Sequence, residues 1–223
     1  MDSRHSEPAD RQVADPDSEE EFPIAIKILV AGGFGVGKTT LVGAVSEIQP
    51  LRTEEIITTE SIPVDNLTGV EEKQTTTVAM DFGRITIRDG LVVYLFGTPG
   101  QRRFWFMWDE LVIGSIGAVV LADTRRLTDC FASVDYFERR GTPFLVAVNC
   151  FEGAEKYAPD DVREALDLDP DVPVVLCDAR ERESSKQVLI ALVTHVVNQL
   201  REQAPRRVPI QPDEQDSEAV ASR

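Results

Sequence analysis

The sequence contains little histidine and little cysteine. Only two histidines, His5 and His195, occur among 223 residues, and we see no Ser-His-Asp set. The three cysteines, Cys130, Cys150 and Cys177, cannot all be paired and show no metal-ligand spacing. These shortages argue against a disulfide framework and a zinc site. We expect small, buried cysteine side chains in a reducing compartment.

Positive charge is also scarce. The chain has 23 lysines and arginines against 39 acids, which gives a formal net charge of −16. Because nucleic acids and anionic membranes are bound through basic patches, both are poor candidates as partners. The longest nearly apolar run, 111–122, is too short to span a bilayer, and no secretory or lipidation signal is visible. We expect a cytoplasmic protein, peripheral to a membrane only through a partner complex.

Large apolar residues are almost absent from the first part of the chain. Residues 1–22 carry eight acids and two arginines, and residues 204–223 have a similar composition. Such segments cannot bury enough apolar surface to order themselves, so both are predicted to be disordered tails. A regulatory arm or a docking peptide is the alternative. A single domain is expected over residues 23–203.

Between these tails, strand patterns alternate with helix patterns. An Asp89-Gly90 turn joins two of the expected strands into a hairpin. The stretch 49–76 has no clear pattern, which is typical of a functional or mobile loop. We predict an α/β fold with about six strands, mostly parallel, one antiparallel hairpin strand, and helices on both faces. The expected strands are 24–31, 77–88, 91–96, 118–123, 144–149 and 172–177, and the expected helices are 38–48, 127–139, 159–166 and 184–200.

One glycine-rich segment lies between the first strand and the first helix. It matches G-x-x-x-x-G-K-[ST] in full, so the predicted fold is that of a P-loop NTPase. Loop amides would face an anion, Lys38 would reach the β and γ phosphates and act in catalysis, and the Thr39 hydroxyl would bind Mg²⁺. The nucleotide-binding residues predicted here are Gly32, Gly33, Phe34, Gly35, Val36, Gly37, Lys38, Thr39 and Thr40.

Segments that resemble the other motifs of Ras-like GTPases follow. Gly97-Thr98-Pro99-Gly100-Gln101 resembles D-x-x-G-Q with its Asp replaced, which implies that Gly100 binds the γ-phosphate and Gln101 orients the attacking water. The segment 77–82 is similar to a switch I sequence, which implies that Thr77 is a second Mg²⁺ ligand. Thr75 and Thr76 are competitors for this role.

Two later segments resemble the guanine readers of the same family. Asn149 matches the N-K-x-D motif, and Glu152 supplies its carboxylate on a longer stem, while Cys150 replaces the lysine. After the next strand, Ala179 would present its amide to guanine O6.

These motifs together resemble small Ras-like and MglA-like bacterial GTPases, and more narrowly the GTPase component of actinobacterial conservon operons. The resemblance covers about 22–200 and includes GGFGVGKTTLV, VAMDFG, FWFMW and VNCF. It implies a switch that binds GTP, GDP and Mg²⁺ and acts beside a roadblock-type protein and a sensor-kinase-like protein.

Three departures from the family pattern qualify this hypothesis. Gly97 removes the acid that would hold Mg²⁺ through a water, so we expect a weaker Mg²⁺ dependence and a gain on Gly97→Asp. Phe34 could crowd the catalytic water and slow hydrolysis, or it could simply pack over the loop. The third departure is the altered base reader, which lacks the usual lysine along the base, so we expect modest nucleotide affinity. As a separate candidate, Asp123 could replace the missing acid, although a cap or salt bridge to Arg125 and Arg126 is favoured.

The run 104–108 holds five large apolar residues in a row, which cannot all face one core. Phe104 and Trp108 are expected in the core, whereas Trp105 or Phe106 could be exposed to a partner. Three functions remain open: a slow GTPase switch, an ATP-using enzyme in which Asp123 is the acid, and a nucleotide-bound scaffold with negligible turnover.

Overall fold

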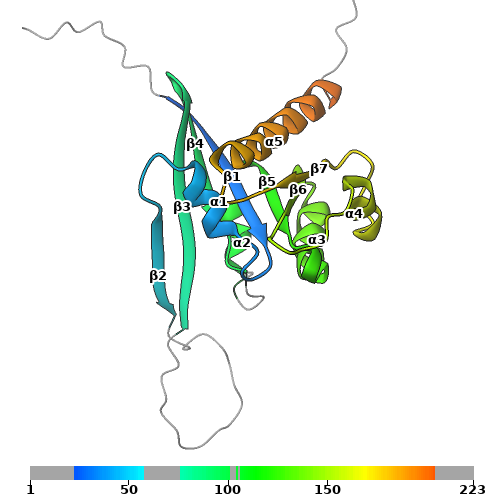
Figure 1. Ribbon diagram of the computed structural model, residues 1–223. Helices are drawn as coiled ribbons and strands as arrows, with labels where there is room; N and C mark the ends of the chain where they lie inside the picture. The colour runs from blue at the N-terminus through cyan, green and yellow to red at the C-terminus, as the bar shows by residue number, and fades with distance from the viewer. Residues whose placement is uncertain (1–22, 58–75, 101–103, 105, 204–223) are drawn as a thin grey trace, which may run out of the picture.

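The computed structural model describes residues 23–57, 76–100, 104 and 106–203. They form a seven-stranded sheet in the order β2-β3-β4-β1-β5-β6-β7, flanked by helices (Figure 1). Strand β3 is antiparallel to both of its neighbours, and the other neighbouring pairs are parallel. The strands are β1 (Ile24–Gly32), β2 (Leu51–Ile57), β3 (Thr76–Arg88), β4 (Leu91–Gly97), β5 (Ser115–Ala122), β6 (Phe144–Asn149) and β7 (Val174–Cys177).

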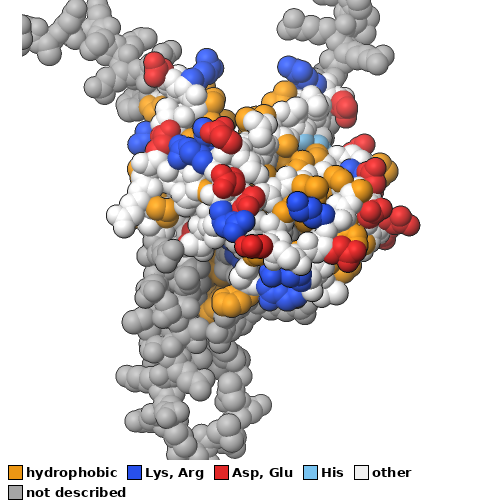
Figure 2. All heavy atoms as spheres, in the orientation of Figure 1, with side chains coloured by type: hydrophobic (Ala, Val, Ile, Leu, Met, Phe, Trp, Pro, Cys, Tyr) orange, Lys and Arg blue, Asp and Glu red, His pale blue; other side chains and the backbone are white. Residues whose placement is uncertain are grey.

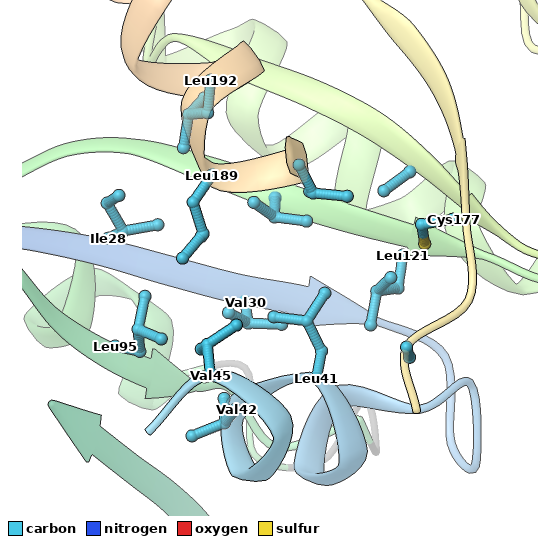
Figure 3. Packing of buried hydrophobic residues seen from close by; sticks show 14 of the residues in the cluster. Ile28, Val30, Leu41, Val42, Val45, Leu95, Leu121, Cys177, Leu189 and Leu192 are labelled. Atoms are coloured by element: carbon cyan, nitrogen blue, oxygen red, sulfur yellow. The ribbon is translucent and has the colours of Figure 1, made fainter. Parts of the chain in front are cut away.

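Helices cover both faces of the sheet because the central strands are apolar on both sides. In β1, Ile28 and Val30 pack toward α1 and α5, whereas Leu29 and Ala31 pack into the core on the side of α2, α3 and α4. Figure 3 shows side chains of α1 and α5 converging on Ile28 and Val30. The helices are α1 (Lys38–Val45), α2 (Phe106–Val112), the 3₁₀ helix η2 (Thr124–Cys130), α3 (Phe131–Arg140), α4 (Pro159–Ala165) and α5 (Arg182–Gln203).

The predicted fold class is confirmed, with one strand added. Residues 51–57, expected to belong to a patternless loop, form β2 at the edge of the sheet. Glu54 and Glu55 interrupt the apolar alternation there, so the strand is recognisable only by its backbone pairing with β3. The predicted helix 38–48 ends earlier, at Val45, and the helix predicted over 127–139 is divided into η2 and α3.

The surface of the described residues carries charges of both signs. On the face that includes α1 and α5, basic and acidic side chains are interspersed (Figure 2). Within the ranges that the structure describes, no helix combines the length and apolar character needed to cross a membrane. The two predicted tails, 1–22 and 204–223, lie outside the described residues.

Candidate nucleotide site

The glycine-rich segment lies between the carboxyl end of β1 and the start of α1, as the motif predicts. Its first member, Gly32, ends β1, and the others form the loop and the first residues of α1: Gly33, Phe34, Gly35, Val36, Gly37, Lys38, Thr39 and Thr40. Gly37 has a φ of 109°, and a Cβ there would lie 2.6 Å from Asn149 Nδ2. Only glycine satisfies both constraints, so the sequence fixes the sharp turn into the helix.

Lys38 turns back into this loop. Its Nζ donates to the carbonyls of Gly32 at 2.9 Å and Gly33 at 2.7 Å. Burial lowers the pKa of Lys38 to about 8, against an opposing effect of the Asp81 charge. A Cβ on Gly100 would lie 2.8 Å from this Nζ and 3.1 Å from the Phe34 amide nitrogen. The structure therefore brings Gly100 directly onto the loop, where a larger residue would crowd Lys38 and the loop backbone.

An acid lies beside Thr39. The Thr39 hydroxyl donates to Asp81 Oδ2 at 2.5 Å, and Asp81 is buried in β3. Asp81 is the register partner of Gly97 in β4, and a Cβ on Gly97 would lie 3.0 Å from Asp81 Cβ and 3.1 Å from Oδ2. The Asp81 carboxylate thus lies beside Thr39 in the space that Gly97 leaves open, while the weaker Mg²⁺ dependence expected from Gly97 stays a prediction.

The backbone of Thr77 lies in β3 opposite Ile56 of β2, four residues before Asp81. Its side chain lies outside the part of the chain that the structure describes, so its role as a metal ligand stays a prediction.

The predicted base readers meet at the ends of β6 and β7. Buried Asn149 donates from Nδ2 to the Val36 carbonyl at 3.0 Å, and its Oδ1 accepts from the Ala179 amide at 3.1 Å. Asn149 thus connects the phosphate loop to the loop after β7. The Ala179 amide would have to give up this bond to meet a base.

Glu152 is exposed near the same edge. Arg180, which follows Ala179, binds Asp178 through its backbone amide, Nε and Nη2. These bonds raise the pKa of Arg180, and the charge of Glu152 adds a smaller contribution. The carboxylate expected to read guanine therefore lies in the field of an arginine already paired with another acid.

Asp123 does not supply the acid of the phosphate site. It accepts from the Arg125 amide at 3.0 Å, pairs with the Arg125 guanidinium at 2.9 and 2.8 Å, and lies 3.5 Å from Arg126. Hydrogen bonds from Arg125 lower the pKa of Asp123. The capping and salt-bridge interpretation is confirmed.

The aromatic run divides as its spacing predicts. Phe104 and Trp108 are buried, and Trp108 Nε1 donates to the Pro99 carbonyl at 3.2 Å, which ties α2 to the segment carrying Gly100. Phe106 is 63% exposed. Trp105 lies outside the described residues.

The remaining expectations at this end of the sheet concern Phe34 and Gln101. Phe34 is 70% exposed, so its ring is largely open to solvent, and its effect on hydrolysis stays a prediction. Gln101, predicted to be catalytic, and the adjacent Arg102 and Arg103 lie outside the described residues. In the part of the chain that the structure describes, no three His, Cys, Asp or Glu residues form a metal cluster.

Solved structures with the same fold include two FeoB proteins. The cytosolic domain of the T. maritima FeoB iron transporter in GDP form I has a TM-score of 0.55 and 18% identity, covering 78% of this chain and 64% of that one. The FeoB G-domain from Methanococcus jannaschii has a TM-score of 0.52 and 16% identity, covering 78% and 98%. These neighbours show that the chain has a G-domain type of P-loop NTPase fold.

Comparison with curated proteins and family models defines the relationship. An uncharacterized protein of Methanocaldococcus jannaschii is 37% identical over 101 residues, which are 45% of this chain and 53% of that protein. The chain thus spans about half the length of this relative. A family model described as conserved hypothetical ATP binding protein matches residues 30–199. That match covers most of the described domain, and the chain therefore belongs to the family of conserved hypothetical ATP binding proteins.

Proposed function

We propose that this protein is a GTP-binding regulatory switch that hydrolyses GTP to GDP slowly. The observation that carries the proposal is the convergence of Lys38, the Thr39 hydroxyl and the buried Asp81 carboxylate at one phosphate-binding loop. A lysine, a hydroxyl and an acid at this place are the parts that bind a metal-bound polyphosphate in P-loop proteins.

The donor set fits Mg²⁺. This ion prefers oxygen ligands, and the Thr39 hydroxyl and Asp81 carboxylate share a hydrogen bond of 2.5 Å beside the loop. Thr39 would bind the ion directly, and Asp81 would hold it through a water. When bound, Mg²⁺ would neutralise charge on the β and γ phosphates.

The protein groups have distinct roles in this proposal. Lys38 exchanges the carbonyls of Gly32 and Gly33 for phosphate oxygens, which are stronger acceptors for an ammonium. The Gly100 amide then donates to the γ-phosphate, and Gln101 orients the attacking water. Loss of the γ-phosphate would release the segment that carries Gly100, and this release would be the signal.

Guanine is the proposed base. Glu152 can accept from the two donors on the Watson–Crick edge of guanine, and Asn149 is fixed beside it by two hydrogen bonds. An ATP-using protein is the second candidate, favoured by the description of the family and by the engagement of the Ala179 amide with Asn149. The partners proposed from the family resemblance are a roadblock-type protein and a sensor-kinase-like protein, in a cytoplasmic complex that could lie at a membrane.

Competition binding tests both candidates. We expect fluorescent GDP and GTP to bind in the presence of Mg²⁺. Unlabelled guanine nucleotides should displace them at least tenfold better than adenine nucleotides. Glu152→Ala should reduce this preference for guanine. Lys38→Ala should weaken GTP binding by about 100-fold, equivalent to about 2.7 kcal/mol. Lys186→Ala is the matched control, because Lys186 lies on α5 and pairs with Glu183.

The outcomes separate the alternatives. Equal or better displacement by adenine nucleotides would favour the ATP-using protein. Tight GTP binding without detectable single-turnover hydrolysis would favour a nucleotide-bound scaffold. Absence of any nucleotide binding by the wild type would refute the proposal as a whole.

A further inference from the structure

Two consecutive arginines in η2, Arg125 and Arg126, have different environments. Arg125 has a structural role, because its Nε and Nη2 donate to the two carboxylate oxygens of buried Asp123 at 2.9 and 2.8 Å. Its guanidinium also lies 4.0 Å from the centre of the Phe151 ring. These are short, charge-assisted contacts together with a cation–π contact, which hold the group in one place.

Among the described residues, the Arg126 guanidinium has only long contacts. Its Nη2 donates to the Phe34 carbonyl at 3.3 Å and lies 3.5 Å from Asp123 Oδ2, and its Nη1 lies 3.8 Å from Asp129 Oδ2. Charge-assisted hydrogen bonds between nitrogen and oxygen are usually 2.7–2.9 Å long. The side chain is also 49% exposed, so this guanidinium is held weakly.

The backbone places Arg126 beside Phe34 and Gly35 of the phosphate loop. Its φ of −147° and ψ of 51° break the helical path within η2 and separate it from Arg125. Its Nη2 lies 3.8 Å from the position of a Cβ on Gly35, in addition to its bond with Phe34. Amides of this part of the loop are those that would cradle the phosphates. The cation therefore already touches the backbone that would hold the nucleotide.

We propose that Arg126 is a catalytic residue for nucleotide hydrolysis and that it acts within its own chain. Its guanidinium would leave its long contacts with Phe34, Asp123 and Asp129 for oxygens of the terminal phosphates. Those oxygens are better acceptors than a carbonyl, and the planar fork can bind two of them together. This inference rests on the proposed function, because it assigns a residue to the hydrolysis step.

The chemical step is a simple displacement. The oxygen of water bonds to the γ-phosphorus while the bond from that phosphorus to the β–γ bridging oxygen breaks. The bridging oxygen keeps the electron pair and becomes a terminal oxygen of the diphosphate, and both protons of the water end on oxygens of the released phosphate. Arg126 transfers no proton and stabilises the negative charge that develops on the phosphate oxygens.

Single-turnover hydrolysis tests the assignment in the full chain. With Mg²⁺ and preloaded GTP, we expect Arg126→Ala to slow hydrolysis by about 100-fold, the usual effect of losing one transition-state donor. Arg126→Lys should be intermediate, because it keeps the charge and loses the fork. Arg139→Ala, which removes an exposed arginine of α3, is the matched control and should hydrolyse at the wild-type rate.

A second measurement separates catalysis from structural support. Aluminium fluoride should tighten GDP binding to the wild type, because GDP with fluoroaluminate imitates the transition state. In Arg126→Ala this gain should be lost, while GDP affinity without fluoride changes by less than about threefold, as expected for an exposed charge.

The results also distinguish failure of the inference from failure of the proposed function. A wild-type hydrolysis rate in Arg126→Ala would overturn the assignment and leave the switch intact. Equal loss of GDP and GTP binding in both Arg126 variants would show that the residue only supports the loop, which also overturns it. A wild type that binds no nucleotide or never hydrolyses it would refute both the proposed function and this inference.

Discussion

Exchange of the residues at positions 81 and 97 is the sharpest test of the site. Asp81 and Gly97 face each other across the β3–β4 pair, and the Asp81 carboxylate contacts Thr39. Asp81→Gly should remove the acid from the metal side of the site. Loss of such an outer ligand usually weakens metal affinity by 10–100-fold. The Mg²⁺ concentration that gives half-maximal GTP binding should therefore rise by about that factor.

Gly97→Asp alone should be harmful, contrary to the gain expected from the sequence. Its Cβ would lie 3.0 Å from Asp81 Cβ and 3.1 Å from Oδ2, which is closer than carbon and oxygen atoms normally approach. Two carboxylates about 4 Å apart repel each other by about 4 kcal/mol at an effective dielectric constant of about 20, which is an upper bound here. We expect the free energy of unfolding to fall by roughly 2–4 kcal/mol.

The double variant Asp81→Gly, Gly97→Asp should recover much of both losses. It again places one carboxylate in the shared space, and a coupling energy above about 2 kcal/mol is expected from a double-mutant cycle. Denaturant unfolding without nucleotide gives the stability, and Mg²⁺ titration of GTP binding gives the affinity. Additive losses in the double variant, or unchanged Mg²⁺ dependence in Asp81→Gly, would refute the reasoning.

Three other predictions concern the loop and its supports. With a pKa of about 8, Lys38 is mostly protonated at pH 7 and mostly neutral at pH 9. GTP affinity should therefore fall by about tenfold over this range. Lys38→Arg stays charged and should show no such fall in the same titration. Asn149→Ala should lower the free energy of unfolding by about 2 kcal/mol or more, because the Val36 carbonyl and the Ala179 amide lose their partner. The control Asn198→Ala, at an exposed position, should change this free energy by less than about 0.5 kcal/mol. Phe34→Gly should hydrolyse bound GTP faster than the wild type, and an equal or slower single-turnover rate would contradict the idea that the ring hinders the water.

The fold was predictable because its signals are local and repeated. Runs of strand length, glycines at the turns and an amphipathic last helix predicted six strands and the phosphate loop to within a few residues. Strand β2 escaped this reasoning because Glu54 and Glu55 break its pattern and only pairing with β3 identifies it. Boundaries such as the early end of α1 at Val45 depend on packing that no short sequence window contains.

The site was harder to predict because its contacts cross between segments. Lys38 and Thr39 follow from one continuous motif, and their placement needs nothing else. The bond between Asn149 and Ala179 joins two loops 30 residues apart, so the residues were found as separate motifs while their contact was not. The weak contacts of the Arg126 guanidinium depend on its distances to Phe34, Asp123 and Asp129. No spacing in the sequence predicts these distances.

Reasoning about register from the sequence alone places Asp81 one residue away from its partner in β4. A tight turn at Asp89 and Gly90 pairs residues whose numbers sum to 179, which places Asp81 opposite residue 98, and the bulge between Thr86 and Arg88 moves it to Gly97. Because the side chains of a register pair lie on the same face of a sheet, a carboxylate on either strand can fill the same space. A motif read along one strand assigns the acid to position 97 and finds it missing. Under the proposed function, one of the two facing positions must carry the acid and the other must be small enough to admit it, so substitutions at these two positions should be tolerated together and not singly.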